Sequence, residues 1–408
     1  MTLARNDAGT AAAFGWLTWV LAFAQLVSWG TLYYGFAVLI IPMQQELGWS
    51  KAALNGAFSL GLVISGLCAI PAGSWIDRRG GRGIMTLGSV LSVLVFLLWA
   101  RVETLPGFFC LMALLGAVSA MVLYDPVFAV LARKFGADCH RAIMTVTLVA
   151  GFASTVFVPL TKVLVAGYGW RAALDILAFC NLAVCVAGHF LFLRETPDDT
   201  AATTLKKEDS RTLATLLPLL RFRPFWGLVV SFTAYYLTAT AMVFHLIPIL
   251  TARDVSQTAI LFCFGVIGPM QVAGRLLLLA FGREVKASRA GGLALLALPA
   301  AILILAAAPS NTWTLAAFAG LFGLGNGIMT IVRGTVIPEF LGLERYGAKG
   351  GAIAFPSNMA KALGPAAGAA LWSVSGDYGL MLWAALACAC LAVLGFWFAA
   401  ACARSDAN

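Results

Sequence analysis

The sequence predicts an all-α membrane protein with twelve transmembrane helices, arranged as two six-helix, pseudo-symmetric bundles. The first observation behind this prediction is composition, because 61% of the 408 residues are hydrophobic and only 11% are charged, against roughly 25% charged residues in soluble domains. With a mean hydropathy of +0.91, the chain has more apolar surface than one soluble core could bury. The other two observations are a single long hydrophilic stretch in mid-chain and a repeat that relates the two halves.

Lipid admits only segments whose backbone polar groups are satisfied internally, so each apolar run long enough to cross a bilayer is predicted to be a helix. The twelve predicted spans are 15–43, 52–76, 83–101, 105–131, 142–167, 170–193, 224–250, 257–282, 289–308, 312–338, 348–374 and 378–402. The hydrophilic stretch RETPDDTAATTLKKEDSRT (194–212) divides them six and six, as a flexible linker would. The sequence therefore predicts an N-terminal bundle (1–193), a cytoplasmic linker (194–223) and a C-terminal bundle (224–408).

The two halves of the chain repeat each other. Pro42 and Pro248 occupy similar places in LIIPMQQELGWSKAA (39–53) and HLIPILTARDVSQTA (245–259), at an offset of 206 residues. Further along the chain, Arg141 and Lys349 correspond at an offset of 208 residues. Two six-helix repeats around a midplane cavity are a plan that transporters use, so this near-constant offset predicts a carrier.

The placement of lysine and arginine indicates the orientation of the spans. One side carries 19 of the 27 basic residues, and the other side carries Lys51, Arg101, Arg171 and Arg253. Both termini are therefore predicted to be cytoplasmic, and the compact loops favour a bacterial inner membrane. The start, MTLARNDAGTAAAFGW, lacks the layout of a cleaved signal peptide, so the first apolar run is expected to be retained. We read the net charge of +9 as this topology signal and not as a nucleic-acid surface.

Four basic residues remain within the predicted spans, namely Lys162, Arg275, Arg333 and Lys361. A guanidinium at the bilayer centre costs roughly 2.5–3.5 kcal/mol on insertion scales, so such residues are kept for a reason. Lys162 lies seven residues before Gly169 and is predicted to snorkel to the interface. Arg275, in GPMQVAGRLLLLAFG (268–282), is too deep for easy snorkelling.

The deep basic residues have polar companions but few acidic ones. Lys361 shares a helix face with Asn358, and Arg333 shares one with Asn326, as expected for helices that line a wet cavity. Asp125, in the fourth span, is the only deep carboxylate. At the offset of 208 residues Asp125 corresponds to Arg333, so these two side chains are predicted to pair as a gate or coupling element.

Arg275 and Lys361 are left without an obvious counter-ion in the protein, and an unpaired charge at low dielectric is strongly unfavourable. A mobile anion is the natural partner, because a planar guanidinium suits bidentate carboxylate binding and an ammonium supplies a point charge. The alternative is that both groups snorkel or donate to the carbonyls of broken helices.

Two further candidates lie in the first and seventh spans. Gln25, Trp29 and Tyr33 recur every four residues, which predicts either a polar and aromatic cavity wall or a packing seam between helices. Tyr235 and His245 can share a helix face. His245 is either a proton carrier near neutral pH or a satisfied structural histidine.

The stretch GSWIDRRGGR (73–82), between the second and third spans, resembles the cytoplasmic signature of the major facilitator superfamily, G-x-x-x-D-R-x-G-R-R. The twelve spans and the repeat extend this resemblance over essentially the whole chain. The resemblance implies that Asp77, Arg78 and Arg82 latch neighbouring helices in the outward-facing state. The alternative is that they only anchor the loop on the positive side of the membrane.

Shorter stretches narrow the resemblance. ELGWSKA (46–52), YGWRAAL (168–174), FHLIPIL (244–250) and QVAGR (271–275) are similar to the monocarboxylate porter and oxalate:formate antiporter groups. This similarity implies that Arg275 and Lys361 meet substrate carboxylates. Monocarboxylate porters often have an aspartate where this chain has Gln271, so that route of proton coupling is missing here. The fourth span also lacks the mid-helix arginine typical of drug:proton antiporters.

We therefore expect a secondary active transporter that moves a small mono- or dicarboxylate by alternating access. The predicted substrate-binding residues are Arg275, Lys361, Arg333, Tyr33, Trp29, Tyr235 and Asn358. Proton symport through Asp125 or His245 and exchange of one anion for another both stay open. The alternative function is efflux of hydrophobic or cationic compounds, for which Asp125 would be essential. No nucleophile, metal or phosphate motif occurs, so we expect a monomeric carrier without cofactors and not an enzyme, a sensor or a nucleic-acid-binding protein.

Overall fold

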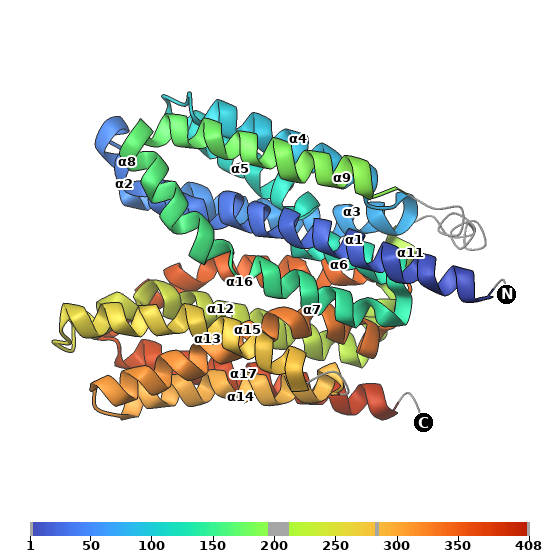
Figure 1. Cartoon of the computed structure of the whole chain (residues 1–408). Coiled ribbons are helices and arrows are strands. Elements are labelled where there is room, and N and C mark those ends of the chain that lie inside the picture. Colours follow the sequence, from blue (N-terminus) through green and yellow to red (C-terminus); the bar gives the residue numbers. More distant parts are fainter. Residues whose placement is uncertain (1–2, 195–211, 282–284, 406–408) are drawn as a thin grey trace. The chain divides into compact units, whose positions relative to one another are not determined.

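The computed structural model describes residues 3–194, 212–281 and 285–405, and every regular element in these ranges is a helix (Figure 1). The chain forms two compact units: unit 1 comprises Met1–Leu216 and Leu343–Ala352, and unit 2 comprises Leu217–Gly342 and Ile353–Asn408. Unit 1 contains α1 (Leu3–Trp29), η1 (Gly30–Tyr34), α2 (Gly35–Leu47), α3 (Lys51–Arg79), α4 (Arg82–Trp99), α5 (Leu105–Val122), α6 (Tyr124–Phe135), η2 (Gly136–Asp138), α7 (Cys139–Ala150), α8 (Ala153–Cys180), η3 (Asn181–Val186) and α9 (Ala187–Phe192).

Unit 2 contains α12 (Arg223–Thr251), α13 (Gln257–Phe281), α14 (Ala287–Ala307), α15 (Thr312–Leu341) and α17 (Gly379–Ser405). Two helices, α11 (Thr212–Arg221) and α16 (Tyr346–Ser375), cross the boundary between the units. The predicted linker, 194–223, thus includes the helix α11, and its residues 195–211 lie outside the described part of the chain.

The helices confirm the predicted class of twelve-span membrane protein. Ten helical segments of the described residues are long and apolar enough to cross a membrane. One of them, Cys139–Phe192, is 54 residues long and contains the fifth and sixth predicted spans, which meet at Gly169, where the backbone leaves the helical region (φ 80°). The eleventh predicted span is α16, whose lysines and glycines lower its hydropathy although its 30 residues suffice to cross a bilayer.

The prediction of one continuous helix over the fourth span, 105–131, is wrong. The span is broken at Leu123, which is extended (φ −77°, ψ −159°) between α5 and α6. The physical reason is Pro126: it has no N–H to donate to the carbonyl of Val122, four residues earlier. The Gln25 side chain, from α1, donates to that carbonyl instead.

Two π-helical segments, η1 in the first span and η3 in the sixth, form a second irregular feature of unit 1. Polar groups join them, because Asn181 Nδ2 donates to Thr31 Oγ1 at 3.0 Å. Thr31 in turn donates to the carbonyl of Val27 at 2.8 Å. Since π-helical turns cost regular hydrogen bonding, such segments are found mostly at functional positions.

The apolar core of unit 1 lies around Trp99, which is fully buried together with Phe96 and Phe108. The Trp99 indole N–H donates to the sulfur of Met43 at 3.4 Å, which gives its polar atom a partner within the core. These aromatic residues come from α4 and α5, and Met43 comes from α2, so one cluster fixes the ends of three helices.

In unit 2, glycines let α13 and α15 pack backbone against backbone. A methyl group at Gly274 would approach the carbonyl of Leu324 to 2.5 Å, and one at Gly323 would approach the carbonyl of Ile267 equally closely. A methyl group at Gly327 would collide with the carbonyl of Gln271. Small residues at such spacings bring membrane helices into close contact. This contact fixes the position of the turn of α13 that carries Arg275.

Candidate functional site

Three basic side chains of unit 2 lie within its spans: Arg275 on α13, Arg333 on α15 and Lys361 on α16. The sequence places no aspartate or glutamate in 255–283, 285–338 or 345–376, so all three stand in stretches free of acid. Arg275 and Arg333 are 5% and 6% exposed, and Lys361 is half-buried. Unit 2 therefore concentrates positive charge in its interior without carboxylates nearby in the sequence.

The environment of Arg275 is the most unusual in this group. Its Nε and Nη1 atoms are buried and have no hydrogen-bond partner, and the described residues form no ion pair with it. Gly274, directly before it, lies against the backbone of α15, so the backbone that carries Arg275 is held against that helix. A buried, unpartnered guanidinium is costly and suits a planar anion that accepts two hydrogen bonds.

The ring of Tyr236, on α12, contacts both of the other two cations. Lys361 Nζ is 4.1 Å from the ring centroid, and Arg333 Cζ is 5.5 Å from it. Arg333 Nη1 also donates to the Tyr236 hydroxyl at 3.4 Å. Asn358 Oδ1 accepts from Lys361 Nζ at 3.2 Å, which confirms that these two residues share a face of α16. Three helices thus meet at one aromatic ring.

Tyr235, the neighbouring residue on α12, is buried and donates its hydroxyl to Asn326 Oδ1 on α15. The two tyrosine rings pack edge to face, with centroids 5.1 Å apart. Tyr235 therefore joins α12 to α15 directly beside the ring that contacts the other two cations.

His245, on α12, contacts the backbone of α16 at a proline. Pro365 has no N–H for the carbonyl of Lys361, so the hydrogen bonding of α16 is interrupted one turn after the lysine. His245 Nε2 is 2.8 Å from the carbonyl oxygen of Pro365, so this nitrogen carries the proton and donates it. The contact gives His245 a structural partner, and its predicted role in coupling stays a prediction.

In unit 1, Trp29 and Tyr33 belong to an aromatic cluster. Their ring centroids are 5.3 Å apart, and Trp29 also lies 4.8 Å from Tyr124, the first residue of α6. Tyr33 further contacts Phe58 at 5.5 Å. Asp125 follows in the first turn of α6, where the positive end of the helix dipole favours a carboxylate. Asp125 lies in unit 1 and Arg333 in unit 2, and their pairing stays a prediction.

The signature residues behave differently from one another. Asp77, at the end of α3, accepts the backbone N–H groups of Gly347 and Ala348 at 2.8 and 2.7 Å and so caps the start of α16 within unit 1. Arg78 Nε donates to a carbonyl of its own helix. Arg82 donates to the carbonyl of Phe190 and stacks on its ring at 4.7 Å.

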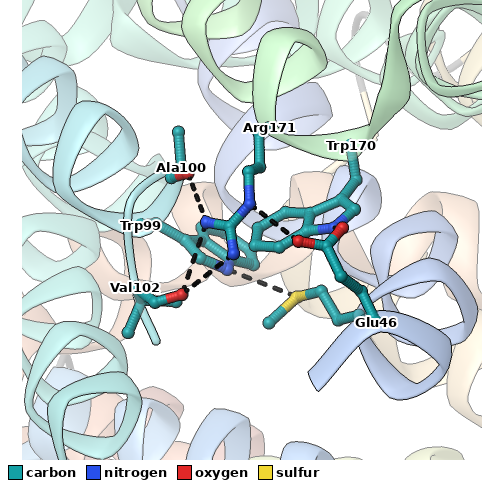
Figure 2. Close-up of polar contacts among 7 residues, drawn as sticks. Glu46, Trp99, Ala100, Val102, Trp170 and Arg171 are labelled. Carbon is teal, nitrogen blue, oxygen red and sulfur yellow. Dashed lines mark hydrogen bonds and ion pairs between the residues drawn. The ribbon is translucent and has the colours of Figure 1, made fainter. Parts of the chain in front are cut away.

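Unit 1 also contains a charged cluster that the sequence prediction did not include (Figure 2). Arg171 Nε donates to Glu46 Oε1 at 2.9 Å, and its Nη1 donates to the carbonyl of Ala100 at 2.7 Å. The Trp170 indole N–H donates to Glu46 Oε2 at 2.6 Å, and the guanidinium stacks on that indole at 4.3 Å. A second ion pair, Arg101 with Asp175 at 2.8 Å, joins α8 to the end of α4.

The sequence analysis missed Tyr236 as a site residue and mentioned Asn326 only as a companion of Arg333. Asn326 could have been predicted as a site residue, because it lies seven residues before Arg333 on the same helix face. Nothing in the sequence around Tyr236 identifies it as a site residue, because its cationic partners are on α15 and α16, about a hundred residues further along the chain.

Comparison with known proteins gives one family. The model of the Major Facilitator Superfamily matches residues 18–307. Monocarboxylate transporter 13 of Rattus norvegicus is 24% identical over 371 residues, which cover 90% of this chain and 84% of that protein. Monocarboxylate transporter 11 of Homo sapiens is 26% identical over 200 residues, 46% of this chain and 40% of that protein.

Two solved structures are similar in fold. FucP, a Major Facilitator Superfamily transporter in the outward conformation, has a TM-score of 0.74 at 14% identity, and the match covers 95% of this chain and 99% of that one. The human organic anion transporter MFSD10 has a TM-score of 0.72 at 16% identity, with the same coverage. At these identities the likeness concerns the fold.

Proposed function

Because the chain belongs to the Major Facilitator Superfamily, we propose that this multi-pass membrane transporter moves a small organic anion, a mono- or dicarboxylate, by alternating access. Two relatives are named monocarboxylate transporters, and one structural neighbour is named an organic anion transporter. These names support a carboxylate as the substrate. The efflux of cationic compounds is less well supported, because the deep charges of unit 2 are positive.

One observation carries the proposal: Arg275 is buried on a helix that contains no acidic residue, with two guanidinium nitrogens that lack a partner. A substrate carboxylate bound there accepts from two guanidinium N–H groups that point the same way, such as those of Nη1 and Nη2, in a bidentate pair, the strongest kind of hydrogen-bonded ion pair. Lys361 supplies a second positive charge, and Asn358 and Tyr235 supply polar contacts beside it. When the anion leaves, the guanidinium is again a buried charge without a partner, which raises the free energy of the empty carrier. Binding and release of the anion can therefore shift the balance between the inward- and outward-open states.

Several finer points belong to the same proposal. The chain lies in a bacterial inner membrane with both termini in the cytoplasm, and residues 1–193 and 224–408 act as the two bundles. Substrate contacts by Trp29 and Tyr33, and the pairing of Asp125 with Arg333, remain predictions for the same site. Coupling is either proton symport through Asp125 or His245, or exchange of anions.

Uptake of radiolabelled lactate and oxalate into proteoliposomes tests the proposal. Losing a buried bidentate pair costs about 3 kcal/mol or more, so Arg275→Leu is expected to reduce uptake by roughly a hundredfold. Lys361→Ala is expected to give a smaller reduction. Arg289→Ala, which removes an exposed arginine of the same unit, is the matched control and should leave uptake unchanged.

Stability separates a binding role of Arg275 from a structural one. Removing a buried charge that no protein group satisfies should keep or raise the melting temperature of the detergent-solubilised protein, while uptake is lost. Normal uptake of both anions by Arg275→Leu and Lys361→Ala, or a melting temperature that falls together with uptake in Arg275→Leu, would contradict the assignment.

A further inference from the structure

The contact of one tyrosine ring with two cations is not explained by helix packing alone. Tyr236 approaches Lys361 Nζ to 4.1 Å and Arg333 Cζ to 5.5 Å, measured from the ring centroid. The three side chains come from α12, α16 and α15, and all belong to unit 2. Since neither cation is further than 5.5 Å from one centroid, the two charges lie within about 10 Å of each other. Like charges this close repel when water is excluded.

An aromatic ring lowers the cost of these charges in a way that an acid does not. The face of the ring carries a partial negative charge and attracts a cation more strongly when both are desolvated. The ring has no net charge, so it does not itself cancel the positive charge of Lys361 or Arg333. A carboxylate in the place of Tyr236 would neutralise one cation and compete directly with an anionic substrate.

The hydroxyl of Tyr236 has a separate role. It accepts from Arg333 Nη1 at 3.4 Å, whereas Lys361 approaches the face of the ring. Arg333 therefore contacts both the ring and the hydroxyl, and Lys361 contacts the ring. A variant that keeps the ring and removes the hydroxyl can separate their contributions.

We propose that Tyr236 is a positioning residue of the anion site: the face of its ring holds Lys361 and Arg333, and its hydroxyl orients Arg333. The proposal rests on the proposed function, since it assigns Tyr236 a role in anion binding. It adds that the affinity for the anion depends on the electron density of this ring. The ring is thus a determinant of specificity that acts through its two cationic neighbours.

A series of substitutions at position 236 tests this dependence through KM for oxalate and lactate uptake. A desolvated cation–π contact corresponds to roughly a 2- to 30-fold effect on binding. Tyr236→Leu is expected to raise KM towards the upper end of this range, with a smaller change in kcat. Tyr236→Phe keeps the ring and should raise KM less than threefold. Incorporation of mono-, di- and trifluorophenylalanine, which withdraw electron density at nearly constant shape, should raise KM stepwise.

Phe232→Leu is the matched control, because Phe232 is a fully buried aromatic residue one turn earlier on α12. It is expected to lower the melting temperature without a selective change in KM. If Tyr236→Leu fails to fold, the fluorinated series still tests the proposal, since these side chains retain the shape of phenylalanine. A KM that is constant across the fluorinated series would overturn the positioning role.

The failures of the two proposals are distinguishable. If Arg275→Leu abolishes uptake while KM does not follow the electron density at position 236, the anion site stands and the role of Tyr236 is refuted. If Arg275→Leu transports normally, the anion site itself is refuted, and the role of Tyr236 with it. A stepwise rise in KM together with inactive Arg275→Leu supports both.

Discussion

The charged side chains described in unit 1 have protein partners, whereas Arg275, the most buried charge of unit 2, has two nitrogens without one. In unit 1, Arg171 is paired with Glu46, Arg101 is paired with Asp175, and Asp77 accepts two backbone N–H groups. In unit 2, Arg275 has two nitrogens without a partner, and the neighbouring spans contain no acid to supply one. Lys361 and Arg333 both contact the uncharged ring of Tyr236.

The two halves of the chain are similar in their helices but not in the placement of their charged side chains. The offset of about 206 residues between repeated positions is a property of the helices, whereas the distribution of carboxylates differs between the halves. Paired charges stabilise a structure that is complete in itself. Unpaired buried charges raise the free energy of the protein alone, and they are retained only where a ligand or a movement repays that cost.

The largest effect on uptake is expected from placing a carboxylate beside Arg275, so that unit 2 gains an ion pair like those of unit 1. Gln271 lies four residues before Arg275, so both side chains lie on one face of α13. In Gln271→Asp, the new carboxylate occupies the guanidinium and competes with the substrate. Oxalate uptake at pH 7.5 should fall by roughly a hundredfold, about 2.7 kcal/mol. Protonating the carboxyl removes its charge and releases Arg275, so uptake should recover as the pH is lowered.

Gln271→Asn is the control for this variant, because it has the shape of aspartate without the charge, and it should transport almost normally. The result that would count against the comparison is full, pH-independent uptake by Gln271→Asp. Arg275 would then not be reserved for a mobile anion.

The next effect concerns the packing that holds Arg275. A methyl group at Gly327 would collide with the backbone carbonyl of Gln271, so Gly327→Ala must separate α13 from α15. We expect a loss of about 1–3 kcal/mol in stability, seen as a lower melting temperature, together with reduced uptake. At Gly320, on the same helix, the nearest atom to an added methyl group is the end of Met270 at 3.9 Å. Gly320→Ala should therefore be neutral or slightly stabilising, and equal losses in both variants would contradict the close packing.

The elements of the fold could be predicted from the sequence wherever one physical rule dominates. Lipid requires long apolar helices, and each of the twelve predicted spans consists of helices in the structure, the fourth and fifth of two helices each. The break at Leu123 was missed although its cause, Pro126, is visible in the sequence. A proline within an apolar run is compatible with either a kink or a break, and the outcome here depends on Gln25, which lies about a hundred residues earlier and takes the freed carbonyl.

The site could be predicted only in part, for a related reason. Arg275 and Lys361 are evident because charge is rare in apolar spans, and Asn358 follows from helical spacing. Tyr236 could not be found, because an aromatic residue in a membrane helix is ordinary until its neighbours in space are known. The cluster of Glu46 and Arg171 was missed for the same reason: residues near the ends of spans read as topology signals before their partners are known.

The smallest effect on stability is expected for substitutions at the pair of Glu46 and Arg171, where we expect destabilisation. The side chains of Glu46 and Arg171 are 48% and 34% exposed, so the charge of their pair contributes at most about 1 kcal/mol. Glu46→Gln keeps an acceptor for Trp170 and should lower the melting temperature only slightly, by an amount that shrinks at high salt. Arg171→Ala should cost more, about 1–3 kcal/mol, because it also removes a bond to a backbone carbonyl and the stacking on Trp170. Thermal unfolding of both variants in detergent measures this difference.

In unit 1, removing an arginine should thus destabilise the protein, whereas Arg275→Leu in unit 2 should not. A stabilised Arg171→Ala would remove the distinction between charges paired within the protein and charges kept for a substrate.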